Sequence, residues 1–234
     1  YPKLLQKSVS IIACNKIAAS SAYEKYRKLK DLAREYNANF LFETNVGAGL
    51  PVINTLNDLT RSGDKINRIE AVLSGTLNFV FNNYDGSRSF SSVVRQAQAE
   101  GYTEPDPRLD LSGTDVAGKI LILAREAGYR LEMSDIENKG FLPESCLAGT
   151  VEDFYAEMEK NEGYFRELLD DARGRNLSLK YIATFDRGQA AVGLQAIDAA
   201  HNFANLSGKD NAVLFYTNRY SDYPLVIKGA GAGA

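Results

Sequence analysis

Two short apolar segments, at residues 8–14 and 40–43, flank one long amphipathic segment near the start of the chain. The first, SVSIIAC, is rich in Ile and Val as buried strands are, and the second, FLFE, is also typical of a short strand. The intervening YEKYRKLKDLAREYNA has apolar residues at helical spacing and follows Ser20 and Ser21, either of which suits an N-cap. A strand, a helix and a strand in this order predict two parallel strands joined by a right-handed crossover.

Further helices and a second sheet are expected after this unit. Helices are predicted at 52–61, at 76–84 with a start at 74–76, at 89–101, at 112–128 capped by Ser112, and within 151–176, and a strand is predicted at 68–75. From Leu177 onward, four runs rich in β-branched and aromatic residues alternate with turn residues, which is typical of antiparallel or mixed strands. The many charges of 151–176 are most simply a solvated helix face. The pattern predicts an α/β protein with a mixed sheet covered by helices.

Composition narrows the classes of function. A net charge of −3 and an apolar share of 44% provide no basic surface for phosphates, and no apolar run approaches the ~20 residues of a membrane span. Cys14, Cys146 and His201 are too few for a zinc, iron–sulfur or haem site built from these side chains. We expect a cytoplasmic protein that binds neither nucleic acid nor a membrane. Because the sequence begins on Tyr1 and stops within GAGAGA, we also expect it to be part of a longer chain.

The stretch GYTEPDPRLDLSGTDVAGK, residues 101–119, begins with an acidic loop that two prolines stiffen. The prolines bias Glu104 and Asp106 towards extended backbone, and Asp110 follows. Alternating acids also occur in calcium loops, but the prolines, Arg108 and the glycine spacing disfavour an EF-hand. A rigid acidic loop suits a small zwitterionic substrate, whose ammonium group the carboxylates would hold.

Asp115 and Lys119, at the end of the same stretch, lie four residues apart and share a face of the predicted helix. An ordinary exposed ion pair, worth about 0.3–0.5 kcal/mol, explains that spacing equally well. The apolar ILILA that follows Lys119 indicates instead that the pair lies in a partly buried place. A lysine withdrawn from water beside another cation has a lowered pKa and can exchange protons near neutral pH.

Two glycine-rich segments allow close approach to a ligand. In ETNVGAGLP, residues 43–51, glycines let the backbone turn sharply, so that its carbonyls and the Glu43 side chain could hold a hard cation such as sodium; a plain strand-to-helix turn is the alternative. The terminal GAGAGA could approach a dinucleotide or form a loose tail. No GxGxxG follows a strand anywhere in the chain.

Five motifs in order resemble the homoserine dehydrogenase family. They are NK at 15–16, ETNVGAGLP at 43–51, SGTLN at 74–78, the 101–119 stretch and PLVIKGAGAGA at 224–234. The wording of ETNVGAGLP is most similar to the bifunctional enzymes in which an aspartate kinase precedes the dehydrogenase. The resemblance implies NAD(P)-dependent interconversion of L-aspartate 4-semialdehyde and L-homoserine, with the protein mainly positioning and polarising the reactants.

The resemblance also implies the architecture and the partners. We expect a partial Rossmann-type nucleotide-binding domain at 1–50, a dimerisation and catalytic α/β domain at 51–222 and a segment returning to the nucleotide domain at 223–234. The expected partners are the small-molecule substrate, NADP or NAD, a monovalent cation, a second copy in a homodimer or larger homo-oligomer, and a covalently fused aspartate kinase.

Individual roles follow from the family's motifs. Lys119 would exchange the proton with the substrate oxygen, Asp115 would orient it, and Lys16 would be the second lysine beside that oxygen and the nicotinamide. The expected substrate-binding residues are Glu104, Asp110, Tyr102, Gly75 and Thr76. The expected cofactor-binding residues are Lys16, Gly101, Gly231 and Gly233. The expected cation ligands are Glu43 and the backbone oxygens of Val46, Ala48 and Leu50.

Some features depart from the family pattern. The first strand and the GxGxxG turn of the nucleotide domain are not in these residues, and neither is the residue that distinguishes NAD from NADP. NKIA replaces the frequent NKKA, and DVAGK replaces DVARK, which leaves both lysines in place. A non-catalytic dimerisation and substrate-binding module is therefore the alternative interpretation. A different oxidoreductase is disfavoured by the ammonium-binding acids.

Overall fold

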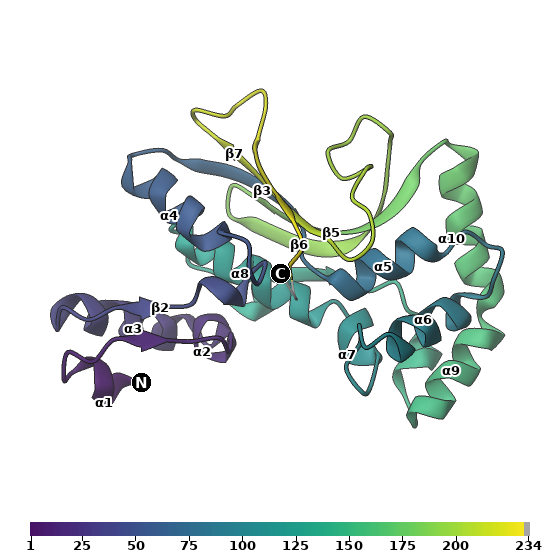
Figure 1. Ribbon diagram of the computed structural model, residues 1–234, viewed down its shortest axis with the longest axis horizontal. Coiled ribbons are helices and arrows are strands. Elements are labelled where there is room, and N and C mark those ends of the chain that lie inside the picture. Colours follow the sequence, from purple (N-terminus) through teal and green to yellow (C-terminus); the bar gives the residue numbers. More distant parts are fainter. Residues whose placement is uncertain (232–234) are drawn as a thin grey trace.

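The computed structural model describes residues 1–231, and its N-terminal unit forms one end of the molecule (Figure 1). This unit contains α1 (Pro2–Leu5), β1 (Ile11–Ile12), α2 (Ile17–Ser20), α3 (Tyr23–Glu35) and β2 (Phe40–Leu41). β1 and β2 pair in parallel, with Ile11 opposite Phe40, which confirms the predicted strand–helix–strand order. Both strands are shorter than expected, because the chain turns into α2 after Lys16 and into the 3-10 helix η1 (Glu43–Asn45) after Phe42.

The second sheet has six strands in the order β4-β6-β5-β3-β7-β8. Their bounds are β3 Ile66–Val72, β4 Ile136–Lys139, β5 Ser178–Asp186, β6 Gln189–Ile197, β7 Asn211–Thr217 and β8 Leu225–Gly229. β4 runs parallel to β6 and the other neighbours are antiparallel, so the predicted mixed sheet is confirmed. The central β3 ends at Val72, and only Leu73 and Ser74 separate it from the next helix.

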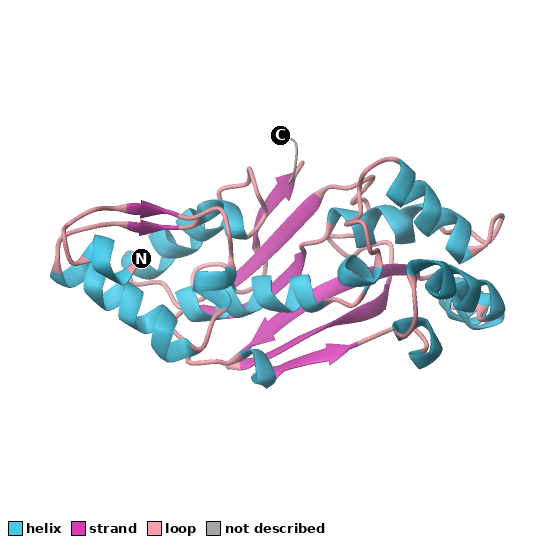
Figure 2. Ribbon diagram, turned by 90° about the horizontal axis from the view of Figure 1, so that it is seen from below, coloured by secondary structure: helices cyan, strands magenta, loops and turns pink. Residues whose placement is uncertain are grey.

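Helices cover one face of this sheet (Figures 1 and 2). Their bounds are α4 Val52–Arg61, α5 Gly75–Asn83, α6 Phe90–Ala99, α7 Arg108–Leu111, α8 Thr114–Glu126, α9 Val151–Lys160 and α10 Glu162–Gly174, with 3-10 turns η2 Met133–Asp135 and η3 Glu144–Leu147. α8 packs against β5 and β6 and, on its other side, against the N-terminal unit. Residues 120–124 of α8 are all fully buried, as expected for a helix that is apolar all round. None of the helices within residues 1–231 combines the length and apolarity that a bilayer crossing requires.

The start of α8 differs from the sequence prediction. Ser112 was the expected N-cap, but the N-cap is Gly113, which has φ +73. A side chain at Gly113 would overlap the hydroxyl of Tyr181, and the left-handed backbone separates α8 from the unpredicted four-residue helix α7. The Ser112 hydroxyl still accepts a hydrogen bond from the free N–H of Thr114 at 3.3 Å, so it serves the helix start from one position further out.

A buried arginine joins α8 to the N-terminal unit. Arg125 Nη1 donates to the carbonyl oxygens of Ala19 (2.9 Å) and Ser21 (2.7 Å), and its Nε and Nη2 donate to Leu131 O at 3.0 and 2.8 Å. Its side chain is fully buried and also pairs with Glu132 at 3.1 Å. This fork fixes α2, and therefore the neighbouring Lys16, relative to α8.

Replacing Arg125 by Met should lower the free energy of unfolding by about 3 kcal/mol, because three buried carbonyls would lose their donor and Glu132 its partner. Arg130→Met is the matched control. Arg130 pairs with Glu24, and both side chains are more than 70% exposed, so the loss should stay below about 0.5 kcal/mol. Urea unfolding of both variants measures the difference; equal losses would contradict the proposed link.

Candidate active site

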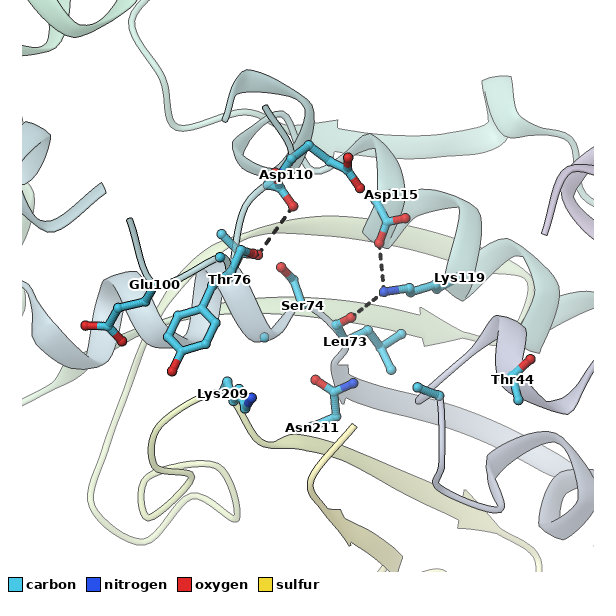
Figure 3. A pocket seen from close by; sticks show the side chains of 15 residues that line it. Thr44, Leu73, Ser74, Thr76, Glu100, Asp110, Asp115, Lys119, Lys209 and Asn211 are labelled. Atoms are coloured by element: carbon cyan, nitrogen blue, oxygen red, sulfur yellow. Dashed lines mark hydrogen bonds and ion pairs between the residues drawn. The ribbon is translucent and has the colours of Figure 1, made fainter. Parts of the chain in front are cut away.

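A cavity of about 590 Å³ opens where β3 ends and where α5 and α8 begin (Figure 3). It brings together nine of the residues predicted from the sequence: Ala48, Gly75, Thr76, Gly101, Tyr102, Glu104, Asp110, Asp115 and Lys119. Further lining residues are Thr44, Leu73, Ser74, Glu100, Lys209 and Asn211. Segments more than 160 residues apart in the sequence therefore meet around one space.

Asp115 lies between two lysines at the edge of this cavity. Its Oδ2 is 2.7 Å from Lys119 Nζ, and its Oδ1 accepts a hydrogen bond from Lys16 Nζ. Lys119 also donates to the carbonyl oxygen of Leu73 at 2.7 Å, and its side chain is 19% exposed. The predicted pair is thus a partly buried cluster of three charges with one surplus positive charge.

The two ammonium groups determine the protonation of Asp115. Burial alone would raise the pKa of its carboxyl, but the charges and hydrogen bonds of Lys119 and Lys16 outweigh burial and hold that pKa below its ordinary value. Asp115 is therefore ionised at neutral pH and can orient both lysines by charge as well as by geometry.

Asp110 organises the acidic side of the cavity. Its Oδ2 accepts the backbone N–H of Glu104 at 2.8 Å, and its Oδ1 is 3.3 Å from the hydroxyl of Thr76, which also donates to the carbonyl oxygen of Tyr102. Burial raises the pKa of the Asp110 carboxyl, and the neighbouring Glu104 and Asp115 charges add to this effect. A bound cation such as an ammonium group would relieve that excess of negative charge.

A second cavity, of about 510 Å³, adjoins the first. It is lined by Cys14, Asn15, Lys16, Ile17, Ser20, Thr44, Asn45, Asp115 and Lys119, so Thr44, Asp115 and Lys119 border both cavities. It lies just beyond the carboxyl ends of the parallel strands β1 and β2, where α/β proteins bind their ligands. The charged cluster thus stands between two spaces that can hold two different reactants.

Of the three glycines expected near a cofactor, Gly101 lines the first cavity and Gly231 contacts Asn211, which also lines it. Gly101 has φ +74. Gly231 lies so close to Asn211 that a Cβ there would be 2.5 Å from Asn211 Nδ2, and its carbonyl accepts the N–H of Gly49 at 3.4 Å. Gly233 lies outside the described residues.

In the glycine-rich loop after β2, the Glu43 carboxylate makes contacts that the sequence did not predict. Glu43 Oε1 and Oε2 accept the backbone N–H groups of Ile53 and Asn54, both at 2.8 Å, so this side chain caps α4. Within residues 1–231, no hydrogen bond ends on the carbonyl oxygens of Val46 and Ala48. No cluster of three His, Cys, Asp or Glu side chains in the same part of the chain is arranged to hold a metal ion. The cation site stays a prediction, with backbone carbonyls as its available ligands.

Lys209 and Asn211 were not identified from the sequence. They precede and begin β7 and lie outside every predicted motif, and a single lysine in a turn carries no pattern. The buried Asn211 has an unpartnered Oδ1 within the described residues, although it lines a polar cavity.

Comparison with known proteins decides the family. The family model described as homoserine dehydrogenase matches residues 51–234. The chain belongs to the homoserine dehydrogenase family. It is 44% identical over 237 residues to the bifunctional aspartokinase/homoserine dehydrogenase 2, chloroplastic, of Arabidopsis thaliana, and 40% identical over 243 residues to the homoserine dehydrogenase of Schizosaccharomyces pombe. All of the chain is covered in both cases, but only 26% and 65% of those two proteins.

Solved structures agree with this family in fold. A Candida auris protein of unknown function superposes with a TM-score of 0.93 at 37% identity, covering 100% of this chain and 67% of that one. A hyperthermophilic archaeal homoserine dehydrogenase in complex with NADPH has a TM-score of 0.72 at 22% identity, covering 100% and 64%. The α/β architecture with a helix-covered mixed sheet is therefore the fold of homoserine dehydrogenases.

Lys119→Met should raise the pKa of Asp115, because one ammonium group is lost while burial remains. A folded pKa below the unfolded value stabilises the protein above the unfolded pKa of about 3.9, and that stabilisation is lost as pH falls through the folded pKa. The variant should therefore lose less stability on acidification than the wild-type protein. A ¹³C NMR titration of the Asp115 carboxyl carbon measures the pKa directly. Lys139→Met, which breaks an exposed pair with Glu137, should leave the Asp115 curve unchanged; an unchanged curve in Lys119→Met would refute the assignment.

Proposed function

We propose that this chain carries the substrate-binding and proton-transfer groups of an NAD(P)-dependent homoserine dehydrogenase, which interconverts L-aspartate 4-semialdehyde and L-homoserine. One observation carries the proposal: a carboxylate between two lysines stands where an acid-lined cavity meets a cavity at the ends of parallel strands. Family membership supports it. In this proposal residues 1–50 belong to the nucleotide-binding domain, 51–222 form the dimerisation and catalytic domain, and 223–234 return towards the nucleotide domain.

The proposed roles follow from charge and position. In the reductive direction, the Lys119 ammonium group donates its proton to the aldehyde oxygen. Lys16 stabilises the negative charge that develops on that oxygen, and Asp115 keeps both lysines in place. Glu104 and Asp110 hold the substrate's ammonium group, and Gly75, Thr76 and Tyr102 shape the pocket around it.

The residues at the second cavity fit the nicotinamide end of NADP or NAD. Lys16, Asn15 and Thr44 follow the parallel strands and lie next to the proton-transfer pair. Gly101 and Gly231 would also approach the cofactor, and the family motif adds Gly233 to them. When bound, the nicotinamide supplies the hydride for the reduction. The archaeal homoserine dehydrogenase of similar fold is in complex with NADPH, which supports NADP or NAD as the cofactor.

A monovalent cation and protein partners complete the proposal. Sodium would be held by Glu43 and by the backbone oxygens of Val46, Ala48 and Leu50. Among residues 1–231, no hydrogen bond is donated to the oxygens of Val46 and Ala48. A homodimer or larger homo-oligomer, and a covalent fusion to aspartate kinase like that named for the Arabidopsis relative, are the proposed assemblies. A cytoplasmic location stays a prediction, and the Arabidopsis relative is named chloroplastic.

Lys119→Met in the full-length protein should lower kcat for homoserine oxidation by about 10²- to 10⁴-fold, the usual contribution of a positioned proton-transfer group. Lys139→Met, an exposed lysine remote from both cavities, should leave kcat within about twofold of wild type. Steady-state kinetics with circular dichroism as a folding check distinguishes the two. Near-normal turnover in folded Lys119→Met would reject the assigned role. The non-catalytic module is tested separately by calorimetry with NADPH, since clear binding to residues 1–234 would reject it.

A further inference from the structure

The first cavity has a basic side as well as an acidic one. Figure 3 shows Lys209 and Asn211 across the cavity from Asp110 and Asp115. The Lys209 ammonium group lies 5.1 Å from the centre of the Tyr102 ring, and no carboxylate among residues 1–231 forms an ion pair with it. A stacked surface lysine would explain the contact with Tyr102, but not the place of Lys209 on the wall of a cavity, opposite its carboxylates.

The backbone that carries Lys209 is fixed from two sides. On one side, Asn78 Nδ2 donates to Gly208 O and Asp210 O, both at 3.1 Å, and Asn82 Nδ2 donates to Leu206 O and Gly208 O, also at 3.1 Å. On the other, the loop packs with Val72, Ile182, Leu214 and their neighbours through the buried side chains of Phe203 and Leu206. The loop is therefore held on α5, the same helix whose first residues line the cavity.

A buried lysine completes this anchor. Lys180, 2% exposed, donates to Asn78 Oδ1 at 3.1 Å, to Asn82 Oδ1 and to Leu206 O at 2.8 Å. Its three acceptors match the three protons of an ammonium group. These hydrogen bonds fix the position of Lys209 relative to the start of α5. Gly75, the first residue of α5, lies so close that a Cβ added there would be 3.1 Å from Lys209 O.

The neighbouring groups on this side also lack protein partners. Asn211 is 5% exposed, its Oδ1 has no hydrogen-bond partner within the described residues, and it lines the cavity next to Lys209. The backbone N–H groups of Gly75 and Thr76 are the first two of α5, a nine-residue helix capped by Ser74, and a helix N-terminus favours an anion. A cation, an amide and a helix N-terminus thus converge on one spot.

We propose that Lys209, with Asn211 beside it, binds the α-carboxylate of the amino-acid substrate and makes the enzyme specific for substrates that carry one. The inference rests on the proposed function and adds a residue to it. The acids on one side take the ammonium group, the lysine and amide on the other take the carboxylate, and the reacting carbon is left facing Lys119. Opposite charges on the two walls also determine the orientation in which a zwitterionic substrate binds.

The test compares two alcohols in the full-length protein: L-homoserine, and 3-aminopropan-1-ol, which is the same molecule without its carboxylate. Lys209→Met should lower kcat/KM for homoserine by about 10- to 100-fold, mostly through KM, since a charged hydrogen bond to the ground state is lost. It should change kcat/KM for 3-aminopropan-1-ol by no more than about twofold, because that substrate never makes the contact. Lys209→Arg should recover most of the homoserine activity.

Matched controls separate the possible failures. Lys160→Met, which removes an ion pair with Glu157 at the surface, should leave kcat/KM for both substrates unchanged. The activity of each variant on 3-aminopropan-1-ol reports whether that variant is folded. If the wild-type protein oxidises homoserine and Lys209→Met keeps the wild-type preference for it over the carboxylate-free alcohol, the role of Lys209 is wrong and the proposed function stands. If the wild-type protein oxidises no homoserine, the proposed function fails, and this inference fails with it.

Discussion

The carboxylate of Asp115 is the contact on which the rest of the candidate site depends. Two ammonium groups, one from α8 and one from the N-terminal unit, would repel each other by about 4 kcal/mol at 4 Å with an effective dielectric constant near 20. Asp115 binds both and turns that repulsion into a stable cluster with one surplus positive charge. Such a cluster is suited to an oxygen that gains negative charge during reaction, because the stabilising charges are already in place before the reaction begins.

The cluster forms only if the N-terminal unit and α8 are held next to each other. Buried polar contacts away from the cavity hold them there. Lys16 belongs to a unit with only a two-stranded sheet, too little to hold it in place by itself. The guanidinium of Arg125 and the carboxylate of Glu126, which pairs with Lys30 at 2.9 Å and accepts from Tyr26, fasten that unit to the last turn of α8. The first two turns of the same helix carry Asp115 and Lys119, so α8 links the contacts with the N-terminal unit to the candidate active site.

Periodicity and family motifs predicted those elements whose structure depends on residues nearby in the sequence. The limits of α4 were predicted correctly, and Gly101 and Gly128 do end their helices with positive φ. The Asp115–Lys119 pair was found because it is local, four residues apart on one face. The start of α8 was missed by one residue, since the position of Gly113 depends on Tyr181 from a distant strand. The hydrogen bonds from α4 to Glu43 were not predicted, because they depend on how the loop folds back; its role as a cation ligand stays a prediction.

The residues that no pattern predicted have one thing in common: each acquires its role from contacts with segments that are distant in the sequence. Lys180 is an ordinary charged residue on a strand until Asn78 and Asn82 of α5 and the 206–210 backbone enclose it. Burial, with some repulsion from Lys228, lowers the pKa of Lys180 to about 8, so it remains mostly an ammonium ion at neutral pH and keeps all three donors. An uncharged residue at position 180 would leave two amide oxygens and a carbonyl without donors. The loop that carries Lys209 would then lose a hydrogen bond that holds it in position. Long-range polar contacts of this kind therefore position Lys209, which we propose binds the carboxylate of the substrate.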